Sequence, residues 1–295
     1  MKAALGDFRR APAALLFLSS MALLSAACRT TPAQDSSEPA TTETKDRAVP
    51  SENAASPSAR PDASTNATAP AEVPKEPAPE PLPESLDFER IVDLPVPGDL
   101  AVRVLHARAP KRRALAYFHG MCSSSTPADI WAKKAAEYGT LIMLRADIPC
   151  GDRPGNKWSK DPAVLTARLD RALTVVKEAR RGHLDTDRIA LLGYSQGAHR
   201  IEVLAGYAPD RYPWLILGGP PEAAVPANFK GARAVAVLGG DLENTDHMRQ
   251  GVQLLTYKGT RARFFRLPAS YHGTFGPKGE EVMAEVLAWT FEDSE

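Results

Sequence analysis

The sequence predicts an α/β fold, with a doubly wound, mostly parallel sheet of about eight strands flanked by helices. Two observations support this prediction. From about residue 88 onward, short apolar segments alternate with longer segments of helical periodicity, a pattern typical of parallel sheets with helices on both faces. In addition, the apolar segment 189–192 leads through a glycine-flanked turn directly into a helical pattern.

The first 28 residues have the pattern of an export signal, with basic residues before an apolar stretch at 11–24. Small residues then lead to Cys28, which indicates a lipoprotein-type signal in which Cys28 is lipidated and becomes the new N-terminus. Such signals carry leucine three residues before the cysteine, and Ser25 stands there instead, so plain cleavage near Ala27 is the alternative. We expect an exported lipoprotein, anchored to a membrane on its periplasmic or cell-surface face, or a secreted protein.

Residues 29–87 predict a disordered tether. The segment 29–84 contains no aromatic residue, is rich in Ala, Pro, Ser, Thr and Glu, and ends in a proline-dense run. Such a composition cannot bury enough apolar surface to offset the entropy of ordering. The folded domain is therefore expected at residues 88–295, which is long enough for a sizeable core.

The net charge of zero gives no indication of a nucleic-acid partner. His, Cys and carboxylate residues do not cluster at ligand spacing, so we expect neither a metal nor another cofactor. We expect a monomer.

The elements follow from local signals. Strands are expected at 89–94 and 101–107, joined by a turn at 97–99, and then at 114–118, 140–146, 189–192, 214–217, 234–238 and 261–267. Helices are expected at 127–138, 161–181, after residue 195, at 246–258 and at 279–291. Prolines mark the beginnings of the first two helices, and alternating arginines in 261–267 favour an edge strand. Ligand sites in such sheets lie beyond the carboxyl ends of the strands.

Gly193-Tyr194-Ser195-Gln196-Gly197 matches the pattern G-x-S-x-G between a strand and a helix. A sharp turn there would expose Ser195 at the beginning of the helix, and the two glycines would let neighbouring backbones pass closely. The N–H of Gln196 would point to where an oxyanion can form. The pattern alone occurs by chance in loops, but the strand and helix around it favour a nucleophile.

Two further strand ends carry reactive side chains. His272 follows the last strand, and the acidic residues Asp241, Glu243 and Asp246 follow the strand before it. The chain order is therefore serine, acid, histidine. In these features residues 88–295 resemble the α/β-hydrolase superfamily, specifically its small esterase-like members without a large cap. The resemblance implies a serine nucleophile, a histidine base and an acid that orients the histidine.

The sequence leaves open which acidic residue orients the histidine. In the family it is usually an aspartate three residues after a glycine that ends the strand, and the count from Gly240 leads to Glu243. Asp241 is nearer to the strand end and is the second candidate. Asp246 is the third, and it could instead cap the following helix.

The resemblance also extends to the segment after the third strand. His119-Gly120-Met121 resembles the family's oxyanion loop, which implies that the N–H of Met121 is the second oxyanion donor beside that of Gln196. We expect His119 to be structural and to bond to the loop backbone. The other histidines, at 106, 183, 199 and 247, are treated as surface or structural residues.

Cys122 and Cys150 follow strands that are neighbours in the hydrolase sheet. Export permits a disulfide between them, which would tie the oxyanion loop to the next loop; two unrelated buried thiols are the alternative. Residues 218–233 are too few for a cap domain. Trp158, in the long loop 147–160, could line the substrate pocket or pack in the core.

Together these patterns predict an exported serine hydrolase that cleaves ester bonds of a small acyl substrate through an acyl-enzyme. One alternative is a peptidase or acyltransferase that uses the same three residues. The other is a surface binding module without catalysis, because the acid departs from the usual aspartate.

Overall fold

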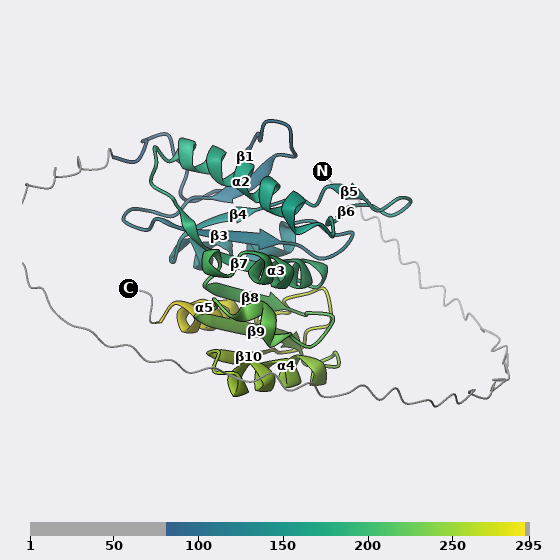
Figure 1. Cartoon of the computed structure of the whole chain (residues 1–295). Coiled ribbons are helices and arrows are strands. Elements are labelled where there is room, and N and C mark those ends of the chain that lie inside the picture. The colour runs from purple at the N-terminus through teal and green to yellow at the C-terminus, as the bar shows by residue number, and fades with distance from the viewer. Residues whose placement is uncertain (1–80, 293–295) are drawn as a thin grey trace, which may run out of the picture. The chain divides into compact units, whose positions relative to one another are not determined.

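The computed structural model describes residues 81–292. The strands of its main sheet are β1 (Val92–Leu94), β2 (Val102–Leu105), β3 (Arg113–Phe118), β4 (Thr140–Met143), β7 (Asp185–Tyr194), β8 (Trp214–Gly218), β9 (Ala234–Gly240) and β10 (Ala262–Leu267). The helices are α1 (Ala132–Ala136), α2 (Pro162–Ala179), α3 (Gln196–Tyr207), α4 (Asp246–Tyr257) and α5 (Gly279–Phe291) (Figure 1). A two-residue pair, β5 (Ile148–Pro149) and β6 (Asn156–Lys157), forms a separate hairpin. The expected signal, the predicted anchor Cys28 and residues 29–80 of the expected tether lie outside the described residues.

The main sheet has eight strands in the order β1-β2-β4-β3-β7-β8-β9-β10. Every pairing from β4 to β10 is parallel, whereas β1 pairs with β2, and β2 with β4, in antiparallel register. The predicted fold class is therefore confirmed, including the hairpin of the first two strands and the position of β10 at an edge.

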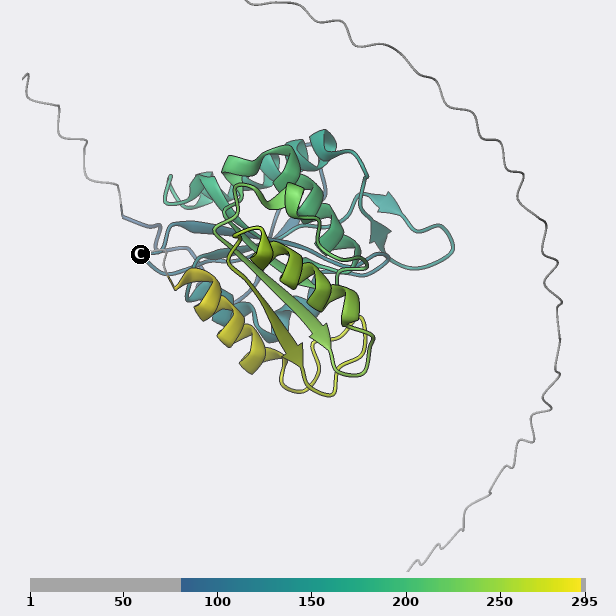
Figure 2. The same ribbon diagram turned by 60° about the horizontal axis from the view of Figure 1, so that its bottom comes forward.

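Helices cover both faces of the sheet, and alternate side chains of each strand face one layer or the other. In β7, Ile189 and Leu191 pack in the core beneath α2, α3 and α4, whereas Ala190 and Leu192 pack in the core beneath α1 and α5. Figure 2 shows α5, in yellow, across the sheet from the green helices. The two cores explain why the strands read as apolar runs with no polar face.

Local signals set several helix boundaries as expected. The Asp161 side chain accepts a hydrogen bond from the Ala163 N–H (2.8 Å), and Pro162 is the first residue of α2. The continuous helix expected at 127–138 is wrong. A 3₁₀ helix (Thr126–Ile130) and α1 are separated at Trp131 (φ −120°, ψ 4°), whose buried indole packs against other aromatic rings. Tertiary packing overrides helix periodicity at this position.

Strands β3, β7, β8, β9 and β10 all run in the same direction. The segments that follow them therefore meet beyond the carboxyl ends of these strands. These segments contain the predicted oxyanion loop, Ser195, the acidic cluster and His272, which is how residues spread over about 150 positions reach one place.

Candidate active site

The turn between β7 and α3 consists of Ser195 alone, since β7 ends at Tyr194 and α3 begins at Gln196. Ser195 has φ 52° and ψ −116°, a conformation that residues with a side chain rarely adopt. A Cβ on Gly193 would lie 2.5 Å from the carbonyl oxygen of Gly197, and one on Gly197 would overlap the carbonyl oxygen of Phe118. The flanking glycines are therefore required by close backbone contacts.

Ser195, His272 and Glu243 form a continuous hydrogen-bonded chain. His272 Nε2 lies 3.0 Å from Ser195 Oγ, and His272 Nδ1 lies 2.8 Å from Glu243 Oε2. The other oxygen of Glu243 accepts the Gly240 N–H at 2.8 Å, which anchors the carboxylate to the end of β9. Since an ionised carboxylate can only accept, the neutral imidazole carries its proton on Nδ1, and Nε2 is free to accept one from the serine.

The other two acidic candidates have different partners. Asp241 Oδ2 accepts a hydrogen bond from Arg266 Nη2 (3.0 Å), and its Oδ1 accepts the Ser270 N–H (3.3 Å). Asp246 is exposed and is the first residue of α4. Its N–H donates to Asn244 Oδ1 (2.9 Å). The cap position belongs to Thr245, so the idea that Asp246 caps this helix is wrong. Of the three carboxylates, the structure brings Glu243 to His272.

Tyr194 is a site residue that the sequence analysis did not identify. Its hydroxyl accepts the N–H of Gly273 at 2.9 Å, and its ring centroid lies 5.7 Å from that of His272. Burial raises the pKa of Tyr194 to about 12, so the hydroxyl stays protonated. Tyr194 thus connects the elbow strand to the loop that carries the histidine. It occupies a variable position of G-x-S-x-G, so the motif gives no signal for this role.

The loop that is predicted to supply an oxyanion donor follows β3 and passes beside the serine. A Cβ on Gly120 would lie 3.6 Å from Ser195 Cβ. The N–H of Gln196 belongs to the first turn of α3, where N–H groups have no carbonyl partner inside the helix. Both residues named as oxyanion donors, Met121 and Gln196, are therefore next to Ser195 or to a residue in contact with it.

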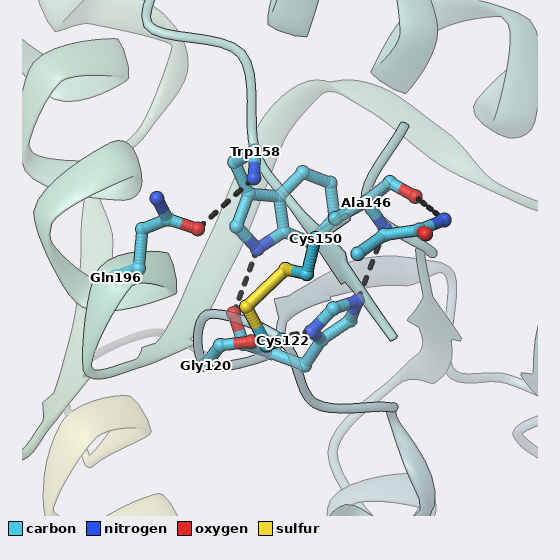
Figure 3. The surroundings of a disulfide bond; sticks show 8 residues. Gly120, Cys122, Ala146, Cys150, Trp158 and Gln196 are labelled. Carbon is cyan, nitrogen blue, oxygen red and sulfur yellow. Dashed lines mark hydrogen bonds between the residues drawn. A yellow bond between two sulfur atoms is a disulfide. The ribbon is translucent and has the colours of Figure 1, made fainter. Parts of the chain in front are cut away.

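The expected disulfide joins Cys122 to Cys150, with a Cα–Cα distance of 5.8 Å (Figure 3). Trp158 is 2% exposed and packs against the rings of Phe118 and His119. Of the two roles left open for Trp158, the structure supports packing in the core. His119 bonds to loop backbone as expected.

Comparison by sequence finds no matching family model and no matching curated protein. Comparison by structure finds a predicted CIB-like hydrolase from Thermoplasma acidophilum, 16% identical, over 67% of this chain and 97% of that one, with a TM-score of 0.50. Naproxen esterase from Bacillus subtilis is 10% identical over 68% and 91% of the two chains, with a TM-score of 0.51. A carboxylesterase from Mesorhizobium loti is 23% identical over 66% and 98%, with a TM-score of 0.49.

The chain has the α/β-hydrolase fold. At these identities the likeness is one of fold, and the chemistry has to be argued from the residues of this chain. The region between β8 and β9 is short. It contains one 3₁₀ helix (Pro226–Phe229) and no cap domain.

A small cavity of about 110 Å³ opens beside the serine. Tyr117, Pro127 and Phe275 supply apolar walls, and Ser195 and His272 also line the cavity. Drug-sized ligands occupy pockets of roughly 300–1,000 Å³, so this cavity suits a small group. Larger hollows of about 400 and 520 Å³ on the described domain are lined by none of these residues.

Within residues 81–292, no three His, Cys, Asp or Glu side chains are grouped so that they could hold a metal ion. Over the same range, no helix combines the length and apolar character that a membrane span requires.

Proposed function

We propose that this protein is an exported serine hydrolase that cleaves esters of short acyl groups through an acyl-enzyme. The observation that carries the proposal is the chain of two hydrogen bonds from Glu243 through His272 to Ser195, at 2.8 and 3.0 Å. A serine hydroxyl is a weak nucleophile near neutral pH, and a base within hydrogen-bond reach is what activates it.

In the first half of the reaction, Ser195 Oγ attacks the ester carbonyl carbon while its proton moves to His272 Nε2. The imidazolium that forms is stabilised by Glu243, which already accepts the Nδ1 proton. Negative charge develops on the former carbonyl oxygen, where the N–H groups of Met121 and Gln196 would stabilise it. His272 then protonates the leaving alcohol as the carbon–oxygen bond breaks, and the acyl group stays on Ser195.

In the second half, water takes the place of the alcohol. His272 accepts a proton from the water as its oxygen attacks the acyl carbon, and it returns that proton to Ser195 Oγ when the acid leaves. His272 is 47% exposed, which gives water direct access to the base.

The cavity supports a short acyl group as the substrate's acid part. Its volume of about 110 Å³ and its apolar walls suit an acetyl or similar group. The alcohol part would lie on the open side, next to the half-exposed histidine, so its size is less restricted. The substrate class is therefore a short-chain acyl ester of an alcohol of variable size.

The geometry supports catalysis over a purely binding role. The binding-module alternative depended on the unusual position of the acid, and Glu243, with its longer side chain, reaches His272 from that position. A peptidase or an acyltransferase would use the same acyl-enzyme and differ only in the group that leaves or accepts.

We also propose that lipidation of Cys28 anchors the domain to a membrane through the segment 29–87. Replacing Cys28 with serine should move the protein from the membrane fraction to the soluble fraction and abolish palmitate incorporation. A soluble, unlipidated wild-type protein that begins near residue 28 would contradict the anchor.

The function is tested with wild type and Ser195→Ala on p-nitrophenyl acetate and with a fluorophosphonate probe, which reacts with activated serines. Wild type should hydrolyse the ester and take up the probe, and the variant should do neither while keeping the circular-dichroism spectrum of the wild type. Absence of both reactions in the wild type would contradict an enzymatic function.

A further inference from the structure

The geometry points to a clasp that positions both oxyanion donors. It is formed by residues 147–158, which contain the hairpin β5–β6, and it is closed by the Cys122–Cys150 disulfide (Figure 3). Trp158 and the disulfide are its two positioning elements. The inference rests on the proposed acyl transfer at Ser195, because the oxyanion arises only in that reaction.

The first donor is the N–H of Met121, in the peptide group that joins Gly120 to Met121. The carbonyl of this same peptide lies 2.7 Å from His119 Nδ1. Since His119 Nε2 accepts the Ala146 N–H at 3.0 Å, the proton of the neutral ring is on Nδ1 and is donated to Gly120. Burial lowers the pKa of His119, which favours that neutral ring. The N–H and C=O of a trans peptide point in opposite directions, so anchoring the carbonyl also sets the direction of the Met121 N–H.

Trp158 connects this loop to the second donor, Gln196. The indole Nε1–H donates to the carbonyl oxygen of His119 at 2.7 Å, and the backbone N–H of Trp158 donates to Gln196 Oε1 at 3.0 Å. Figure 3 shows the indole of Trp158 between Gln196 and the loop at Gly120. One buried residue therefore holds the backbone of the oxyanion loop and the side chain at the beginning of α3.

The disulfide fixes the remainder of the clasp. Cys122 directly follows Met121, and its N–H donates to the carbonyl oxygen of Asn156 at 2.9 Å. Residues 151–155 are exposed, and β5 and β6 have two residues each, so apolar burial contributes little to holding this hairpin. The covalent bond to Cys150 compensates, since it keeps the hairpin against the residue next to the oxyanion donor.

A fixed pair of donors lowers the barrier because no reorganisation is needed when charge develops on the oxygen. Loosening them should weaken binding of the tetrahedral transition state and leave binding of the planar ester almost unchanged. The clasp should therefore act on kcat rather than on KM, whereas a merely structural role would change the amount of folded enzyme without changing its kinetic constants.

The test compares wild type with Trp158→Phe and with the double variant Cys122→Ala/Cys150→Ala. Phenylalanine keeps most of the ring packing and removes the indole donor. Trp214→Phe is the matched control. Trp214 is also buried, but it lies at the amino end of β8, whereas the site lies beyond the carboxyl ends of the strands. The readouts are kcat and KM for p-nitrophenyl acetate and the Ki of a short-chain trifluoromethyl ketone, which forms a tetrahedral adduct with the serine.

In both clasp variants kcat should fall by about tenfold to a hundredfold, the Ki should rise by a similar factor, and KM should not change. Trp214→Phe should behave as wild type. Dithiothreitol, which reduces the bridge to two thiols as it is itself oxidised to a cyclic disulfide, should lower the kcat of wild type and not that of the double variant. If the double variant does not fold, Trp158→Phe and the reduction of wild type decide the question.

Wild-type values of kcat and Ki in folded Trp158→Phe and in the reduced enzyme would overturn the clasp and leave the proposed function standing. A loss that appears equally in Trp214→Phe would also overturn it. Failure of the proposed function looks different, because the wild type itself would then hydrolyse no ester and take up no fluorophosphonate.

Discussion

The two sides of Ser195 are built in different ways. On the acid–base side, His272 is 47% exposed and its two ring nitrogens contact Glu243 and Ser195. On the oxyanion side, His119 and Trp158 are 2% exposed, and a disulfide closes the loop. The difference matches what each side has to do. In the proposed mechanism His272 accepts and releases protons next to water, whereas the proposed oxyanion donors, the N–H groups of Met121 and Gln196, act best when they do not move.

The largest effect on kcat is expected from a change on the acid–base side. Glu243→Gln should lower kcat by at least about 10², because an amide can favour the wrong tautomer of His272 and cannot counter the imidazolium charge. Asp241→Asn is the matched control and should lower kcat much less, since Asp241 contacts Arg266 and the loop backbone. Steady-state kinetics on p-nitrophenyl acetate measures both. A large loss confined to Asp241→Asn would transfer the role of the acid to Asp241.

For the free energy of unfolding, changes on the oxyanion side should have the larger effect. Loss of the Cys122–Cys150 bridge, which spans 28 residues, should lower the free energy of unfolding by roughly 2–4 kcal/mol. Glu243→Gln should change it less, since the amide oxygen of glutamine can still accept the Gly240 N–H that anchors this side chain. Urea unfolding of Cys122→Ala/Cys150→Ala and of Glu243→Gln measures the two values. Equal losses would mean that the two sides do not differ in rigidity.

A buried histidine away from the site separates pH effects on stability from those on catalysis. Burial, with the nearby Arg180 guanidinium, lowers the pKa of His106 from 6.5 to about 4. Between these two values the unfolded chain binds a proton that the folded chain does not, so the free energy of unfolding falls as the pH falls, by on the order of 3 kcal/mol. His106→Phe should reduce this dependence. Urea unfolding of both proteins at neutral pH and near pH 4.5 measures it, and a difference between them that is the same at both pH values would contradict the prediction.

The smallest predicted effect concerns the walls of the acyl cavity. Phe275→Ala removes one wall and should raise kcat/KM for p-nitrophenyl octanoate relative to the acetate by about tenfold, the scale of a few methylenes of apolar contact. Leu254→Ala, on the exposed surface of α4, is the control. An unchanged ratio would mean that the acyl chain lies elsewhere.

The sequence was informative where the signal is local. Strand periodicity, the prolines at helix starts and the glycines around Ser195 all act over a few residues, and the fold and the elbow follow from them. The choice of acid was harder, because Asp241 and Glu243 are two residues apart and both follow β9. What separates them is that Asp241 is bound by groups 25 and 29 residues away, which no local pattern encodes.

The clasp could not be predicted from local sequence patterns either. Its hydrogen bonds join His119 to Ala146, Trp158 to His119 and Trp158 to Gln196, which are 27, 39 and 38 residues apart. The two cysteines were the one signal of this arrangement in the sequence. They indicated which loops meet, but not that Trp158 bonds both to the His119 carbonyl and to the side chain of Gln196.

The acyl-enzyme itself is the most direct test of the proposed mechanism. Wild-type protein is mixed with p-nitrophenyl acetate, quenched in acid within the first turnover and digested for mass spectrometry. We predict a burst of nitrophenolate approaching one per enzyme and an acetyl group on Ser195, with Ser195→Ala showing neither. Turnover by wild type with no burst and no adduct, or an adduct that persists in Ser195→Ala, would contradict the account.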